Sequence, residues 1–407
     1  MRRFRVPILG LFAVASSWLH AAPATAQTAT AGQLVISEFR LRGSGGANDE
    51  FIEIYNNSGA DHTVTAASGT GYGIAASDGD TRCTIPNGTI IPNRGHWLCV
   101  NSVGYSIAGY AAGNGTTATG DATFTVNIPD NAGIALFNNN SGGGSYSLAS
   151  RLDAIGSTSE ANTLYKEGTG YLPLVPFSID LSFARDECGK GGSTTLAGPC
   201  SLTAPKDTDN NAADLVFVDT NGTSAGAGQR LGAPGPENLS SPIQRNDTIA
   251  AALLDTCVAA SAVPNRVRDF TSDPIGFASF GTIDLRRTFT NNTGGPITRL
   301  RFRIIDLSTF PVPSGTADLR PKSSTGTIAT VDGPVCGGGT LPVTIVGAAL
   351  EQPPAQPNGG GFNSSMSDET ITLADPLPNG ATRSIRFVFG IQQTGTFKVY
   401  VNIEALP

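Results

Sequence analysis

The chain has 407 residues, a formal net charge of −7 and only 14% charged residues. This length suits two domains, and the acidic balance argues against general nucleic-acid binding, which needs a positively charged surface. Glycine (50) and proline (26) are frequent, and Val, Ile, Thr and Phe recur in short runs. Short apolar runs separated by turn-forming residues are typical of strands. We therefore expect an all-β protein.

The first 26 residues have the pattern of a secretory signal peptide. Three arginines among the first five residues precede the apolar run "VPILGLFAVASSWL", and an A-T-A motif ends at Ala26. This pattern predicts cleavage between Ala26 and Gln27. The apolar run is shorter than the roughly 20 residues that a membrane-spanning helix needs. We expect a secreted protein, extracellular or periplasmic, with no membrane span in its mature chain.

The next predicted elements are two antiparallel strands joined by a glycine-rich turn. "LVISEFRL" (34–41) and "EFIEIYN" (50–56) both alternate with a period of two, so we expect the odd-numbered residues of 34–41 to share one face. "GSGGAND" between them has the residues that turns require. Glu38 and Glu53 fit an acid–base pair as well as the polar positions of a hairpin. We favour the hairpin, because no cleft residue accompanies them, and we assign no catalytic residue.

Six cysteines in an exported chain predict disulfides. Closeness in sequence favours Cys83–Cys99 and Cys188–Cys200, which leaves Cys257–Cys336 in the second half. Other connectivities stay open, because six cysteines allow fifteen. A zinc site is the alternative, but the chain has no C-x-x-C motif and only two histidines after residue 26.

The acidic stretch "DTDNNAAD" (207–214) partly resembles a calcium loop. Asp207, Asp209 and Asp214 are its candidate metal ligands. Ala212 stands in place of the required glycine, and Val218 in place of the final glutamate. A turn with Asx hydrogen bonds is the alternative and the one we favour, so we expect no bound cofactor.

Charge and proline content place a domain boundary near residue 241. Residues 27–244 hold 10 basic and 20 acidic residues, whereas residues 245–407 hold 13 of each. Between them, "LGAPGPENLSSPIQRND" contains three prolines and is typical of a turn-rich linker. We expect domains at 27–241 and 242–407, and a protease-accessible linker near 236–246.

The second half contains further alternating segments. In "RLRFRII" (299–305), leucine, phenylalanine and isoleucine share one face and arginines the other. We expect "IDLRRTFT" (283–290) to pair with it so that Arg286 lies opposite Arg301. "SIRFVFGI" (384–391) and "FKVYVNIEAL" (397–406) continue the alternation, which predicts a second β-sandwich.

The expected register gathers four arginines on one sheet face. A solvated face is the simpler interpretation. The alternative is an anion-binding surface for an acidic polysaccharide or for the acidic domain of a neighbouring molecule. The candidate anion-binding residues are Arg286, Arg299, Arg301 and Arg303.

Residues 33–240 resemble the bacterial lamin-tail domain family. "LVISEFRLRGSGGANDEFIEIYNNSG" resembles the first strands of that family, and the later matches follow in the family's order. These are "IPNRGHWLCV", "NAGIALFNN", "RLDAIG", "LSFARD", "DTDNNAADLVF" and "LGAPGPEN". The chain departs from the family in Gly/Asn-rich insertions at 104–120 and 138–149. The resemblance implies an immunoglobulin-like β-sandwich that is usually a non-catalytic accessory domain.

Together these observations predict two immunoglobulin-like β-sandwiches in tandem after a signal peptide. The function that we expect is non-enzymatic contact with a protein or a surface polysaccharide, at the cell surface or outside the cell. The alternative is an accessory part of an extracellular hydrolase or nuclease system. "GTSAG" (222–226) matches the hydrolase motif G-x-S-x-G, but no helix-forming segment and no histidine follows Ser224.

Overall fold

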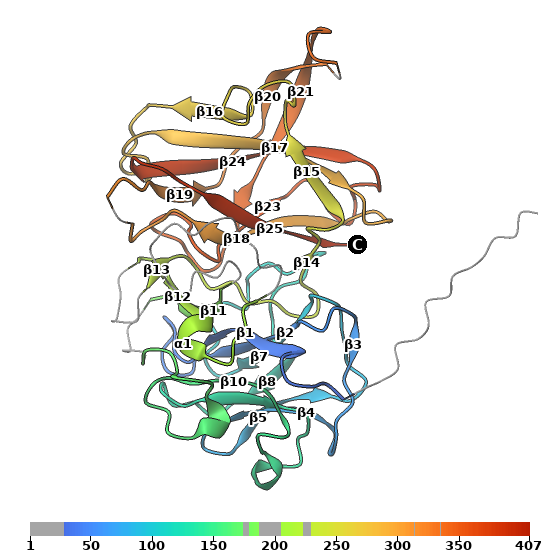
Figure 1. Cartoon of the computed structure of the whole chain (residues 1–407), viewed down its shortest axis with the longest axis vertical. Helices are drawn as coiled ribbons and strands as arrows, with labels where there is room; N and C mark the ends of the chain where they lie inside the picture. Colours follow the sequence, from blue (N-terminus) through green and yellow to red (C-terminus); the bar gives the residue numbers. More distant parts are fainter. Residues whose placement is uncertain (1–27, 174–178, 187–204, 223–228, 313, 334) are drawn as a thin grey trace, which may run out of the picture.

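The computed structural model describes residues 28–407 apart from 174–178, 187–204, 223–228, 313 and 334. Its regular structure is almost entirely strand, in four main sheets that form two sandwiches stacked along the long axis (Figure 1). The all-β prediction is confirmed. Within the described ranges, no helix is long and apolar enough to cross a membrane. The predicted signal peptide, with Ala26 and Gln27, lies outside them, as does Ser224.

The first sandwich packs a seven-stranded sheet against a four-stranded one. The larger sheet has the order β13 (Arg230–Leu231), β12 (Leu215–Asp219), β11 (Leu181–Arg185), β1 (Leu34–Arg40), β2 (Phe51–Asn56), β7 (His96–Asn101) and β8 (Ala122–Phe124). The smaller sheet has the order β10 (Arg151–Ile155), β9 (Ile134–Phe137), β4 (Gly71–Ala76) and β5 (Thr81–Pro86). Shorter elements are the β3 (His62–Thr63) and β6 (Ile90–Ile91) pair, α1 (Asn211–Asp214) and the 3₁₀ turns Gly143–Ser145 and Thr163–Tyr165.

Strands β1 and β2 pair antiparallel as predicted, but β1 contains a bulge at Ser37. Ile36 lies opposite Ile54 and Glu38 opposite Glu53, so Ser37 is an extra residue. The expected single alternation through 34–41 is therefore wrong, because the bulge exchanges the two faces of the strand. The β1 side chains in the core are Leu34 and Ile36 before the bulge and Phe39 after it, with Leu41 following the strand.

The second sandwich packs a five-stranded sheet against a seven-stranded one. The five-stranded sheet has the order β14 (Ile243–Gln244), β25 (Val399–Leu406), β18 (Arg299–Leu307), β23 (Ser365–Asp368) and β22 (Ala349–Leu350). The other has the order β15 (Ile249–Leu253), β17 (Thr282–Asn291), β24 (Thr382–Gln393), β21 (Thr340–Gly347) and β20 (Thr327–Asp332), with β16 (Arg266–Asp269) on β17 and β19 (Asp318–Lys322) on β24.

The two faces predicted for β18 are confirmed, but the predicted pairing of β17 with β18 is wrong. Leu300, Phe302 and Ile304 lie in the core of the second sandwich. β17 belongs to the opposite sheet, where Arg286 lies opposite Arg386 of β24. The apolar residues of β17 and β18 meet across the core, and alternation alone does not distinguish that arrangement from pairing within one sheet.

Two of the three predicted disulfides are confirmed. Cys83 of β5 is bonded to Cys99 of β7, which joins the two sheets of the first sandwich. Cys257, after β15, is bonded to Cys336 in the loop between β20 and β21. The predicted pair Cys188–Cys200 lies outside the described residues.

The segment that joins the sandwiches lies between them and is largely buried. Residues 231–238 and 241–244 are buried, so the expectation of a protease-accessible linker near 236–246 is wrong for most of its length. The prolines here do not mark a solvated spacer, because side chains and backbone of both sandwiches bind this backbone. For example, Ala233 donates from its amide to the carbonyl of Phe362 at 3.1 Å.

Candidate functional site

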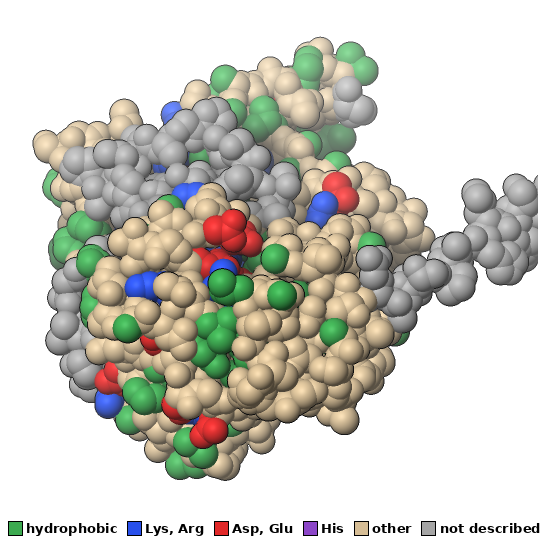
Figure 2. All heavy atoms as spheres, turned by 60° about the horizontal axis from the view of Figure 1, so that its bottom comes forward, with side chains coloured by type: hydrophobic (Ala, Val, Ile, Leu, Met, Phe, Trp, Pro, Cys, Tyr) green, Lys and Arg blue, Asp and Glu red, His purple; other side chains and the backbone are tan. Residues whose placement is uncertain are grey.

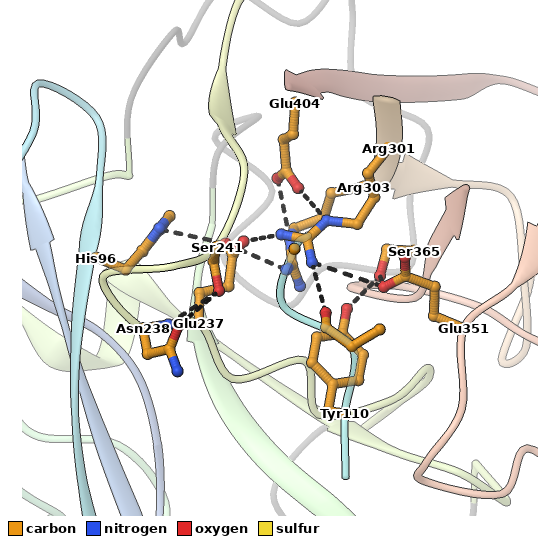
Figure 3. Close-up of polar contacts among 12 residues, drawn as sticks. His96, Tyr110, Glu237, Asn238, Ser241, Arg301, Arg303, Glu351, Ser365 and Glu404 are labelled. Carbon is orange, nitrogen blue, oxygen red and sulfur yellow. Dashed lines mark hydrogen bonds and ion pairs between the residues drawn. The ribbon is translucent and has the colours of Figure 1, made fainter. Parts of the chain in front are cut away.

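A cluster of charged residues, all buried except the half-buried Arg299, lies where the two sandwiches meet (Figure 3). The first sandwich contributes side chains from β1, β2 and β7, the joining segment contributes one, and the second sandwich contributes the rest from β18, β25 and the residue after β22. We call this group the interdomain cluster. Its members are Glu38, Glu53, His96, Glu237, Arg299, Arg301, Arg303, Glu351 and Glu404.

Two arginines of β18 form the centre of the cluster. The side chain of Arg301 donates to Oε1 of Glu237 and, through Nε, to Oε2 of Glu404 at 2.7 Å. Arg303 donates through Nε to Oε1 of Glu404 at 3.1 Å, and its Nη2 lies 3.1 Å from Oε2 of Glu237. Each arginine therefore bridges the joining segment and β25.

The local sequence explains why these arginines meet carboxylates. β18 places its apolar residues in the core, so Arg301 and Arg303 point to the opposite face, which the first sandwich covers. β25 pairs with β18 so that Glu404 lies directly opposite Arg301. Cross-strand neighbours of opposite charge contact each other at this spacing.

A second carboxylate and a tyrosine surround Arg301 on its other side. Nη1 of Arg301 lies 3.6 Å from Oε2 of Glu351, which also pairs with Arg299. The same Nη1 donates to the carbonyl of Ala111 at 3.3 Å, and the guanidinium lies 5.9 Å from the ring centroid of Tyr110. Ala111 and Tyr110 belong to the Gly-rich segment 104–120, which therefore contacts the second sandwich (Figure 3).

Glu38 and Glu53 are buried acceptors that hold the joining segment. Glu38 accepts from the amide of Gly235 at 3.0 Å and from the hydroxyl of Ser182 at 2.6 Å. Glu53 accepts from the amide of Glu237 at 2.7 Å and from the hydroxyl of Ser37 at 2.5 Å. The bulge at Ser37 thus supplies a donor to the carboxylate on the neighbouring strand. These two residues lie on paired antiparallel strands as predicted, but they are buried and contact the segment that joins the sandwiches.

The cluster contains more carboxyl groups than guanidiniums. Five glutamates face three arginines, an excess of two negative charges when His96 is neutral. Burial raises the pKa of Glu38, and burial together with the negative charge of Glu38 raises the pKa of Glu53 well above its usual range. Both shifts favour the neutral form of these carboxyls, which carries no negative charge.

His96 contacts two of the carboxylates. Its Nε2 lies 3.3 Å from Oε2 of Glu237 and 3.8 Å from Oε1 of Glu53. Burial, together with the positive charges of Arg303 and Arg301, lowers the pKa of His96 well below its usual value. His96, Glu53 and Glu237 are close enough together to ligate one metal ion. However, the guanidiniums of Arg301 and Arg303 already bind both oxygens of Glu237, and their positive charges disfavour a cation there.

The space left inside the cluster is small. A cavity of about 40 Å³ is lined by residues that include Glu38, Glu53, His96, Glu237 and Arg303. This volume accommodates ordered water, whereas pockets for organic ligands are about 300–1,000 Å³. The arrangement is therefore suited to holding the two sandwiches together rather than to admitting a substrate.

The candidate calcium loop is also organised around a buried arginine. Arg185 binds both carboxylate oxygens of Asp153 at 2.7 Å and lies 3.4 Å from Asp207 and 3.6 Å from Asp214. Asp214 accepts from the amide of Thr208 at 2.8 Å, and the carboxylate of Asp207 is hydrogen-bonded to the backbone of Asp209, two residues on, which agrees with the alternative of an Asx turn.

The three proposed ligands do not form one acidic site with the required spacing. Asp153, Glu167 and Asp207 lie close enough to ligate an ion, but Asp209 and Asp214 are not members of that group. Burial and the neighbouring charge of Asp153 raise the pKa of Glu167 to about 9. The guanidinium of Arg185 thus supplies the positive charge that a metal ion would otherwise supply.

The structure separates the four arginines that were predicted to share an anion-binding face. Arg286 lies on β17 and pairs with Asp284 at 2.8 Å, in the sheet opposite β18. Arg301 and Arg303 are buried and bound by glutamates, and Arg299 pairs with Glu351. The prediction of a single exposed arginine surface is wrong. The contact with the acidic domain of a neighbouring molecule was the other form of this prediction. In the structure, Arg301 and Arg303 instead contact Glu237 of their own chain.

The other acidic residues of the first hairpin point elsewhere. Asp49 pairs with Arg40, and Ser106 donates to it at 2.7 Å. Glu50 accepts from Asn101 at 2.7 Å and from the amide of Ile128 at 2.8 Å. Burial raises the pKa of Glu50 to about 7. The four carboxylates of this hairpin therefore do not form one cluster.

Comparison of the chain with protein-family models, with curated proteins and with solved structures finds no match.

Proposed function

We propose that this protein is an exported, non-catalytic binding protein. In this proposal a lamin-tail-type sandwich and a second sandwich, both of immunoglobulin-like type, form one rigid unit that contacts a protein or a surface polysaccharide outside the cytoplasm. The two disulfides and the pattern of the first 26 residues support export.

The observation that carries the proposal is that the carboxyl and imidazole side chains of the interdomain cluster are buried and bound within the protein. Glu38, Glu53 and His96 are residue types that perform acid–base chemistry in enzymes. Here they are buried between the sandwiches and bound by backbone amides, hydroxyls or neighbouring charges. A histidine and carboxylates used in this way favour a structural role over a catalytic one.

The outer surface of the first sandwich agrees with a role in contact. On the face shown in Figure 2, most of the surface is uncharged, and acidic and basic side chains lie in small groups, several of them next to one another. A continuous basic surface, which nucleic-acid binding would need, is absent from the described part of that face.

The proposal is tested by a binding array combined with an activity screen. The chain starting at Gln27 is applied to immobilised cell-wall polysaccharides and extracellular proteins, with heat-unfolded protein as the control. The same preparation is assayed with esterase, glycosidase and nuclease substrates. We expect specific binding and no turnover. A turnover that Glu53→Gln abolishes while the far-UV circular dichroism stays unchanged would overturn the proposal.

A further inference from the structure

One flank of the second sandwich leaves part of β25 without a neighbouring strand. β14 pairs with β25 only at Ala405 and Glu404. The chain then leaves this sheet and enters β15 of the opposite sheet. In the described part of the chain, no strand pairs with residues 399–401 of β25 on that side.

The free edge carries backbone groups that point outward. Ile403 uses its amide and its carbonyl on the β14 side, where they bind Asn246 and Arg245. Lys398, in contrast, uses its carbonyl on the β18 side, where it accepts from Ser308. Because successive residues of a strand point to alternate sides, the amides and carbonyls of Val399 and Val401 point outward like those of Ile403. Such a row is a template for another strand.

An apolar groove runs beside this edge. Two cavities are involved: one of about 240 Å³ is lined by strands of both sheets, and one of about 270 Å³ is lined by the seven-stranded sheet and by residues 394–397 just before β25. The two cavities are neighbours along the strands. On each of three segments, one residue lines the first cavity and the residue two positions away lines the second. These pairs are Leu285 and Ile283 on β17, Phe389 and Ile391 on β24, and Val399 of β25 with Phe397 just before it. Two places along a strand are also the spacing of side chains on one face.

The rim of the groove is basic. Arg287 lines the first cavity, and Arg266 and Arg268 line the second. Their hydrogen bonds go to backbone carbonyls, as from Arg287 to Asn265. Among the described residues, none of these three guanidiniums forms an ion pair with a carboxylate. Acidic side chains on an incoming segment would complement them.

We propose that this flank binds an extended segment of another polypeptide, which adds to β25 as an antiparallel or parallel strand. Its backbone pairs with Val399 and Val401, every second side chain is apolar and enters the groove, and acidic residues lie near Arg266, Arg268 and Arg287. The outward backbone groups select a strand rather than a sugar or a lipid, because they need regularly spaced donors and acceptors. This inference rests on the proposed binding function and specifies its partner.

The test uses a fluorescent, capped peptide in which valine alternates with glutamate or threonine, long enough to pass from Ile403 to Phe397. Binding to the purified chain is measured by fluorescence anisotropy. Ala251 of β15 lines the first cavity and is exposed, so Ala251→Phe should fill the groove without removing an existing contact. Ala250, which is also exposed, does not line that cavity, and Ala250→Phe is the matched control.

We expect saturable binding that Ala251→Phe weakens by at least about tenfold and that Ala250→Phe leaves unchanged. Methylation of those backbone amides of the peptide that face β25 should abolish the binding, and added salt should weaken the binding. Equal binding by the two variants, or no binding of the alternating peptide, would overturn the inference. A dimer that Ala251→Phe dissociates, without peptide binding, would also overturn it by identifying a second copy as the occupant.

The two proposals fail in different ways. A turnover abolished by Glu53→Gln would overturn the binding function whatever the peptide does. Specific binding on the array that Ala251→Phe leaves intact, without peptide binding, would overturn only the strand-addition site.

Discussion

Arg301 of β18 binds the carboxylate of Glu237, which lies in the segment that joins the two sandwiches. Both side chains are almost fully buried, so the contact replaces water around two opposite charges at the domain boundary. Burying such a pair costs desolvation, but removing one partner leaves the other charge buried and unpaired. Moving the two sandwiches apart would therefore separate two buried opposite charges.

We predict that Arg301→Leu strongly destabilises the protein, by about 3–5 kcal/mol in urea unfolding. The substitution leaves Arg303 as the one arginine between Glu237 and Glu404, so a single guanidinium then faces two buried carboxylates. Arg94→Leu is the matched control, because Arg94 also pairs across the domains, with Asp247, but that pair is more exposed. The control should lose no more than about 1 kcal/mol. Equal losses in both variants would contradict the role assigned to burial.

The pKa of Glu50 predicts a pH dependence of stability. Burial raises this pKa from 4.5 to about 7 in the folded state. Between these values the folded protein holds a proton that the unfolded chain has released, so the free energy of unfolding falls as the pH rises through that window. Glu50→Gln cannot titrate and should make this fall shallower, whatever its effect on absolute stability. Urea unfolding at several pH values measures the slope, and identical slopes would show the prediction to be wrong.

We predict that the two confirmed disulfides contribute differently to stability. Cys83–Cys99 closes a loop with a sequence separation of 16, and Cys257–Cys336 one of 79. The loop-entropy relation gives about 3 and about 4.5 kcal/mol for them. Replacing each pair by serine and measuring urea unfolding tests the order. The Cys83–Cys99 variant also loses core packing, so its alanine counterpart separates the two effects.

The buried joining segment predicts resistance to proteolysis. Residues 231–238 and 241–244 are covered by both sandwiches, and a protease needs an accessible, extended backbone. A brief digest of the native protein with a protease of broad specificity should not release the two sandwiches by cleavage within these residues. Mass spectrometry of the fragments is the measurement. Early cleavage at 234–238 would show that the segment is exposed in solution.

Some features of the fold could be predicted from the sequence because they depend on local spacing. Alternation identified the two faces of β18, and closeness in sequence identified Cys83–Cys99. The bulge at Ser37 could not be predicted. Its neighbours are one apolar residue, Ile36, and one polar residue, Glu38, so the pattern does not show that the two faces of the strand exchange at this point. The pairing of β17 was also wrong, because a hydrophobic face shows that a strand is buried but not which strand lies beside it.

The interdomain cluster could not be predicted for a related reason. Glu53, His96, Glu237 and Glu404 are far apart in the chain, and each resembles an ordinary polar residue in its own segment. Only the arginines carried a local signal, because Arg301 and Arg303 alternate with core residues. That signal indicated a polar face but not what covers it. The proline-rich segment likewise has the composition of a solvated linker, although its amides donate to Glu38 and Glu53.

The claim that the two sandwiches form one unit is tested most directly by following unfolding with two probes. In the chain starting at Gln27, Trp97 is the single tryptophan and lies in the first sandwich, whereas far-UV circular dichroism reports on both. We predict that the two urea-unfolding curves coincide in the parent protein and separate in Arg301→Leu. Two separate transitions in the parent, with Trp97 following only one of them, would contradict the account.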